Sequence, residues 1–191
     1  MPPPYETVHV VVDDSTIADG NLAKILEPVW WRATIYEGPE EYERTLAQFS
    51  REQRLMFALR WYLSEVNNGG HHQFYSNSTG IVWRDAAYAF EALDLDEGVS
   101  IITDSAERLG GKPSLDRERR QMQMEKHAAG FRDLDDRLYA LADEADIEQA
   151  MVAYIRNHPE AFYFTGEITR VVLPTRTPRQ GNSLPPESSL P

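Results

Sequence analysis

Four side-chain amides gather around two adjacent glycines in the segment 67–77. The residues concerned are Asn67, Asn68, Gly69, Gly70, Gln73, Phe74 and Asn77. Adjacent glycines let the backbone turn sharply, and amide side chains can satisfy the backbone groups that such a turn leaves free. The segment has the composition of a polar ligand pocket, but a helix-to-helix corner held by side-chain amides explains it better. We expect the corner.

Other chemistry-bearing residues lack a catalytic or metal-binding arrangement. His71 and His72 are adjacent, so in a helix or strand their side chains point in different directions and cannot easily share one metal ion. Asp94, Asp96 and Glu97 resemble paired catalytic carboxylates, but acids at a helix start usually complement the helix dipole. The sequence has no cysteine, no phosphate-binding glycine loop and no nucleophile elbow. It therefore predicts no enzyme, no catalytic residue, no metal and no cofactor.

The clearest chemical feature is a dense run of carboxylates. It consists of Asp133, Asp135, Asp136, Asp143, Glu144, Asp146 and Glu148. Acids three or four positions apart on a helix lie about 5–6 Å from one another. Rows of carboxylates at that spacing can imitate the phosphate oxygens of DNA. We predict that these seven residues bind a partner, and a merely solvated acidic face is the alternative.

The charge of the whole chain points to the same kind of partner. The 191 residues include 31 acids and 19 bases, which gives a net charge of −12. Such a chain repels phosphate backbones and anionic membrane surfaces, and it attracts basic proteins. We therefore expect a basic DNA-binding protein or another protein as partner, with no direct nucleic-acid or membrane contact.

The chain is expected to form one domain over residues 1–173, followed by a disordered Pro/Ser-rich tail over residues 174–191. No apolar run approaches the roughly 18–20 residues that cross a bilayer. The first residues lack the basic and then apolar pattern of a secretory signal. Together with the absence of cysteine, these features favour a cytoplasmic protein.

Apolar residues at helical spacing predict a mainly α fold, a compact domain of about six to seven helices. The apolar stripes run through residues 42–49, 55–66, 82–93, 102–109, 131–141 and 147–155. A capping box at Ser50 and Gln53 starts one helix, Gly69-Gly70 ends it, and Asp146 caps the last. Residues 115–129 are helix-prone but have few apolar positions, chiefly Leu115, Met122 and Ala129. That segment should be exposed or pack along one narrow line.

The two ends of this domain differ from its middle. Thr7 to Val12 and Ile168 to Val172 are both rich in β-branched residues. Such runs favour strands, and the two can pair as a short β element. Because an isolated pair of strands is marginally stable, we expect it to pack on helices.

The segment from about Phe49 to Leu109 resembles a bacterial family, described largely as a domain of unknown function, that includes a dimeric DNA-mimic protein. The resemblance rests on Glu65–Gly70, on Gln73-Phe74-Tyr75 with Asn77, on Ala86–Leu93, and on the later stretches Leu134–Tyr139 and Tyr154–Asn157. The family-like core spans about residues 39–164. The resemblance implies an all-α fold, a homodimer and no known enzymatic activity. The family's DNA mimic binds the DNA-binding surface of a transcriptional regulator through its acidic face.

One basic segment departs from a uniformly negative surface. Residues 111–133 contain the bases Lys112, Arg117, Arg119, Arg120, Lys126 and Arg132. DNA mimicry then requires that these bases lie on the side opposite the acidic face or at the dimer interface.

Three hypotheses follow. The first is a non-enzymatic acidic protein-binding domain, a DNA mimic that occupies the DNA-binding surface of a basic regulator. The second is a plain partner-binding or immunity-type domain without mimicry. The third is a ligand-binding or enzymatic site at the corner between Asn67 and Asn77. A contiguous carboxylate face favours the first, and a closed pocket with converging histidine and amide groups favours the third.

Overall fold

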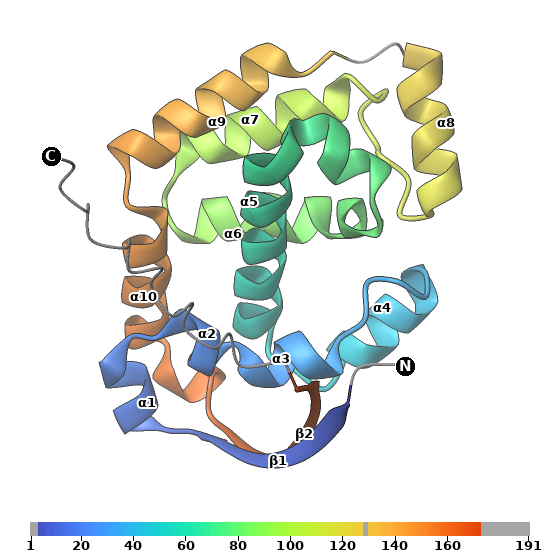
Figure 1. Ribbon diagram of the computed structural model, residues 1–191. Coiled ribbons are helices and arrows are strands. Elements are labelled where there is room, and N and C mark those ends of the chain that lie inside the picture. The colour runs from blue at the N-terminus through green and yellow to red at the C-terminus, as the bar shows by residue number, and fades with distance from the viewer. Residues whose placement is uncertain (1–3, 128–129, 173–191) are drawn as a thin grey trace, which may run out of the picture.

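The computed structural model describes residues 4–127 and 130–172. The predicted tail, residues 174–191, and Ala129 lie outside the described residues. Within them the chain forms ten α-helices, two short 3-10 turns and one two-stranded sheet (Figure 1). The predicted mainly α fold is confirmed.

The helices follow one another with short connections. They are α1 (Asp14–Asp19), α2 (Leu22–Ile25), α3 (Glu27–Arg32), α4 (Pro39–Leu46), α5 (Arg51–Ser76), α6 (Trp83–Ala92), α7 (Asp96–Glu107), α8 (Arg117–His127), α9 (Arg132–Glu144) and α10 (Ile147–Asn157). The 3-10 turns are η1 (Ser78–Val82) and η2 (Pro159–Ala161). The seven helices from α4 onward match the predicted segments. Helices α1 to α3 exceed the predicted number, because helices of four to six residues are too short to show an apolar stripe.

Helix α5 is the centre of the fold and packs against α3, α6, α8 and α9 (Figure 1). Its predicted capping box is present: the Ser50 hydroxyl accepts from the Gln53 amide at 3.0 Å, and the Gln53 side chain accepts from the Ser50 amide at 3.1 Å. Its apolar stripe is buried, including Leu55, Leu59 and Val66. The amphipathic pattern thus determines which face of α5 turns inward.

The helix breaks where the two glycines predict a break. Gly69 and Gly70 have non-helical backbone angles, and Gly70 has a φ of 72° and a ψ of −179°. That region is adopted almost exclusively by glycine. After the break a short helical turn continues to Ser76. The result is a corner that redirects the chain toward α6.

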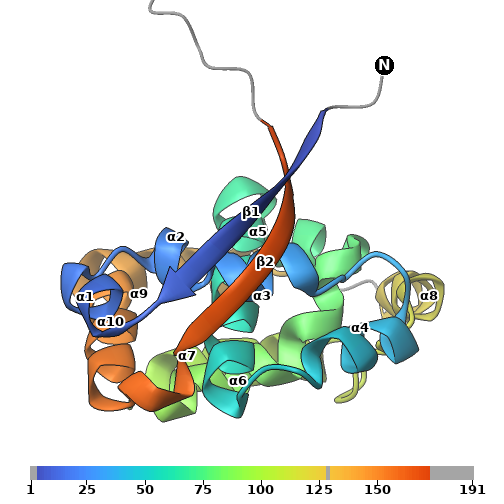
Figure 2. The same ribbon diagram turned by 90° about the horizontal axis from the view of Figure 1, so that it is seen from below.

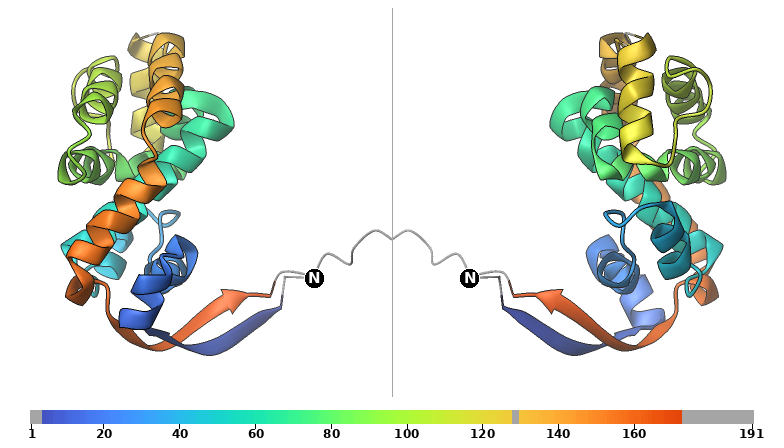
Figure 3. Two further views of the ribbon diagram at one scale, coloured as in Figure 1. Left: turned by 90° about the vertical axis from the view of Figure 1, so that its left-hand side faces the viewer. Right: turned by 90° about the vertical axis from the view of Figure 1, so that its right-hand side faces the viewer.

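Strands β1 (Tyr5–Val12) and β2 (Phe164–Val171) pair antiparallel, with Tyr5 opposite Val171 and Val12 opposite Phe164. The ribbon crosses beneath the helices and extends away from them (Figures 2 and 3). Helix α3 holds β2, since Arg32 donates to the Glu167 carbonyl at 2.6 Å and lies over the Phe164 ring at 5.0 Å. The predicted β element from the two ends is confirmed, including its packing on helices.

Helix α8 packs along one narrow line, as predicted, but the residues on that line differ from the predicted apolar positions. Arg120 and Met124 form its buried side, whereas Met122 is 59% exposed. Among all the helices in the described part of the chain, none combines the length and the apolar character needed to cross a bilayer.

Candidate protein-binding groove

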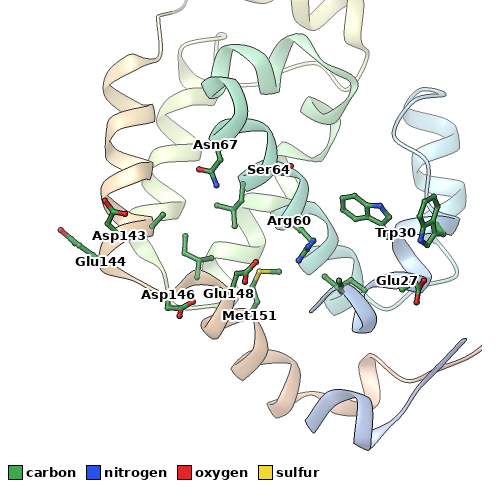
Figure 4. Close-up of a pocket in the computed structure, with 16 residues that line it drawn as sticks. Glu27, Trp30, Arg60, Ser64, Asn67, Asp143, Glu144, Asp146, Glu148 and Met151 are labelled. Carbon is green, nitrogen blue, oxygen red and sulfur yellow. The ribbon is translucent and has the colours of Figure 1, made fainter. Parts of the chain in front are cut away.

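A groove of about 1000 Å³ opens between the N-terminal helices and the junction of α9 and α10 (Figure 4). Helices α2 and α3 form one wall, the α9–α10 junction forms the other, and α5 forms the floor. The lining residues are Ala23, Leu26, Glu27, Trp30, Trp31, Arg60, Leu63, Ser64, Asn67, Ala142, Asp143, Glu144, Asp146, Ile147, Glu148 and Met151. We call this set the groove.

The groove has an apolar part. Trp30 stacks on Trp61 with ring centroids 4.5 Å apart and planes 9° apart, so its position is fixed by the core. Trp31 is half-buried and, unlike the other three tryptophans, does not pack against the buried core. Leu63 is half-buried on α5, and Met151 is almost fully buried on α10. The groove therefore offers apolar surface that the protein itself covers only in part.

The rest of the groove is acidic. Asp143, Glu144, Asp146 and Glu148 are all exposed on the α9–α10 wall, and no ion pair is formed by any of the four within the described residues. Asp146 also caps α10, because its carboxylate accepts from the Gln149 amide at 2.9 Å. This wall presents four carboxylates to whatever enters the groove.

Two further charges complete the lining. Glu27 lines the groove from α3, and its carboxylate is held by Arg170 at 2.7 Å. Arg60, the one base among the lining residues, projects from α5 between the two walls (Figure 4). The lining thus carries five acids and one base, an excess of negative charge.

The remaining predicted acids lie elsewhere. Asp133 forms two hydrogen bonds with Arg108, at 2.5 and 2.7 Å, which lower the pKa of Asp133 to about 2. Asp136 is exposed on α9 and does not line the groove. Asp135 is half-buried and makes an internal contact. The structure thus brings together four of the seven predicted partner-binding acids and engages Asp133 and Asp135 within the fold.

Asp135 holds the corner in place through a buried histidine. Its carboxylate accepts from the His71 amide at 2.8 Å and contacts His71 Nδ1 at 2.5 Å. Burial lowers the pKa of His71, although the bond to Asp135 opposes the shift, and the imidazole is therefore neutral at neutral pH. With Nδ1 donating to Asp135, Nε2 accepts from the Tyr62 hydroxyl at 2.6 Å. His71 is fully buried, so these hydrogen bonds with Asp135 and Tyr62 stabilise the fold.

The predicted corner residues brace the turn in the same way. The side chains of Gln73 and Asn77 both donate to Glu65 Oε2, at 2.8 and 3.0 Å. Phe74 is fully buried with its ring 5.0 Å from that of Tyr62. The amides thus satisfy partners inside the protein and do not converge on an open pocket.

Two other predicted corner residues are on the surface: Asn67 lines the groove and Asn68 is exposed. Within residues 4–127 and 130–172, no group of three histidines and acids has the arrangement of a metal site.

The basic segment lies at the end of the molecule opposite the acidic wall. Figures 1 and 2 both place α8 far from the α9–α10 junction. Arg117 donates to the Ser76 carbonyl at 2.9 Å, and Arg120 donates to the Tyr75 carbonyl at 2.8 Å. These arginines cap the C-terminus of α5, where cations complement the helix dipole. DNA mimicry requires that these bases lie either opposite the acidic face or at the dimer interface, and they lie at the end opposite the acidic wall.

A comparison with protein families identifies the central part of the chain. A family model described as DMP19-like protein matches residues 47–158, which is more than half of the sequence. The chain belongs to the DMP19-like family. No curated protein and no solved structure matched it.

The DMP19-like part runs from just before α5 to the end of α10, so it supplies the floor and the acidic wall of the groove. Helices α2 and α3, which supply the other wall, lie outside the matched residues.

Sequence reasoning missed Glu27, Trp30, Trp31 and Arg60. The adjacent tryptophans were the available signal, because two large aromatic residues side by side on a short helix cannot both turn into the core.

Proposed function

We propose that this protein is a non-enzymatic, acidic partner-binding domain that occupies the DNA-binding surface of a basic regulator. The observation that supports this function best is the α9–α10 wall, where four exposed carboxylates lie together and form no ion pair with any residue that the structure describes. The bases of α8 lie at the other end of the molecule, so they do not cancel this field. Membership of the DMP19-like family is consistent with DNA mimicry. The proposal includes a homodimer, as the family resemblance implies, and a cytoplasmic location, which the absence of cysteine favours.

The protein itself should not bind duplex DNA at physiological salt. The protein and DNA are both strongly negative and repel each other. Binding to DNA would need free basic side chains, and two of the arginines of α8, Arg117 and Arg120, instead donate to backbone carbonyls of the protein. An electrophoretic mobility assay with labelled duplex checks this. Binding that falls with added salt would show that α8 is a nucleic-acid site and would contradict mimicry.

Neutralising the acidic wall should weaken the capture of a basic partner. The variant combines Asp143→Asn, Glu144→Gln and Glu148→Gln, and it spares Asp135, which braces the fold, and Asp146, which caps α10. We expect affinity for a DNA-binding protein captured from native cytosol to fall about tenfold or more, since charge-assisted contacts at an interface dominate steering and specificity. Surface plasmon resonance at graded salt measures the change.

A matched control separates position from net charge. Glu40→Gln, Glu91→Gln and Glu118→Gln remove three exposed acids on α4, α6 and α8, none of which lines the groove. This control should bind like the wild type. Duplex DNA should displace the captured partner. If the partner binds through the acidic wall but DNA does not displace it, plain partner binding without mimicry is the better function.

A further inference from the structure

The groove combines features that a purely DNA-like surface does not need. Phosphate mimicry requires carboxylates at suitable spacing on a polar surface. Here the lining that holds the carboxylates of Asp143, Glu144 and Glu148 also includes the half-buried apolar side chains of Trp31 and Leu63. A partner that offered only lysines and arginines would leave these two apolar side chains uncovered. We infer that the groove accepts a basic amphipathic helix of the partner protein, an inference that rests on the proposed function.

The shape of the groove fits the side of a helix. Its volume of about 1000 Å³ lies between two helical walls with α5 beneath them, an arrangement in which an amphipathic helix lays its apolar side into the opening. A helix with its side chains is roughly 10–12 Å across, so only one face enters such a groove. The apolar anchors of the incoming helix would meet Trp31 and Leu63, which are both half-buried.

The charges specify where the cations of that helix must lie. Four carboxylates stand on the α9–α10 wall, whereas Glu27 on the opposite wall is already paired with Arg170 at 2.7 Å. Arg60 projects between the walls and forms no ion pair with any described residue. A cation entering along the middle would be repelled by Arg60, whereas cations along the flank that faces the α9–α10 wall would meet the four carboxylates. The incoming helix is therefore apolar at its centre and basic along that flank.

Two peptides of identical composition test this. The first contains about 18 residues of leucine, lysine and alanine, with leucines spaced to form one helical face. The second is a scrambled isomer without such a face. Isothermal titration calorimetry with the full-length protein should show that the first peptide binds at least about fivefold more tightly than the second.

Three variants locate the binding. Trp31→Ala should weaken the amphipathic peptide by roughly fivefold, since truncating a buried aromatic anchor commonly has effects of this size. Tyr36→Ala removes another exposed aromatic residue outside the groove and should have no effect. Arg60→Gln should strengthen binding of the cationic peptide about threefold, because it removes the one base of the lining. A gain of affinity is not expected from a residue with a purely structural role.

The outcomes separate this inference from the proposed function. If both peptides bind equally and only the neutralised acidic wall weakens them, the helix proposal is overturned while the acidic partner-binding domain stands. If neither the acidic variant nor Trp31→Ala changes binding, both proposals fail. If Trp31→Ala changes the oligomeric state in analytical ultracentrifugation and leaves peptide binding unchanged, a second copy occupies the groove and the helix proposal is overturned.

Discussion

Replacing Arg120 by methionine is expected to destabilise the protein by roughly 3–5 kcal/mol. The side chain is fully buried and, within the described part of the chain, donates only to backbone carbonyls. The distances are 2.8 Å to Tyr75, 2.6 Å to Asn77, 2.6 Å to Ser114 and 3.2 Å to Leu115. Methionine keeps the apolar stem but leaves these carbonyls without their donors.

Burial lowers the pKa of Arg120 to about 10, so the guanidinium still carries its charge at neutral pH. It therefore joins the C-terminus of α5 to the segment before α8 by charge-assisted hydrogen bonds. Urea denaturation followed by circular dichroism gives the free energy of unfolding. The neighbouring substitution Arg119→Met changes an exposed side chain and should alter stability by less than about 0.5 kcal/mol. A loss below about 1 kcal/mol for Arg120→Met would mean that water replaces its donors.

Gly70→Ala is expected to lower the free energy of unfolding by about 3–5 kcal/mol, and Gly70→Val by at least as much. The first reason is the backbone, because a φ of 72° with a ψ of −179° is strained for any residue with a Cβ atom. The second reason is space. An added Cβ would stand 2.5 Å from Asp135 Oδ2, so the carboxylate that holds His71 would have to move.

Gly38 provides a matched control for the backbone effect. It has a φ of 94° and a ψ of 177°, and an added Cβ would meet no atom within 4 Å. Gly38→Ala should therefore show only the strain of about 1–3 kcal/mol. The difference between the two variants in chemical denaturation measures the contact with Asp135. Equal losses at both positions would show that Asp135 and His71 adapt without penalty.

Much of the helical framework was predictable from local rules. The capping box at Ser50, the break at Gly69-Gly70 and the cap at Asp146 depend on residues within one helical turn, and all three are present. Helices α1 to α3 were not predictable, because segments of four to six residues contain too few positions to show a period. Tertiary contacts with α10, β1 and β2 hold them instead.

The candidate site was predictable on one side only. The density of acids identified the α9–α10 wall, but its apolar counterpart at Trp30 and Trp31 comes from a distant part of the sequence. Sequence also could not separate Asp135 from Asp136, since only the rotation of α9 decides which carboxylate faces His71. Sequence also could not predict the burial of Arg120, because arginine is usually a surface residue and this side chain lies in the interior.

The β1–β2 ribbon has a consequence for the order of folding. Its register joins Val12 to Phe164, so β1 leaves the ribosome long before its partner strand exists. The helices from α5 to α10 form through neighbouring segments and can assemble during synthesis, whereas closing so long a loop carries a large entropic penalty. The ribbon therefore cannot form before β2 has been translated, and until then β1 stays an unpaired, β-branched segment. A chaperone that protects nascent strands would find its substrate here.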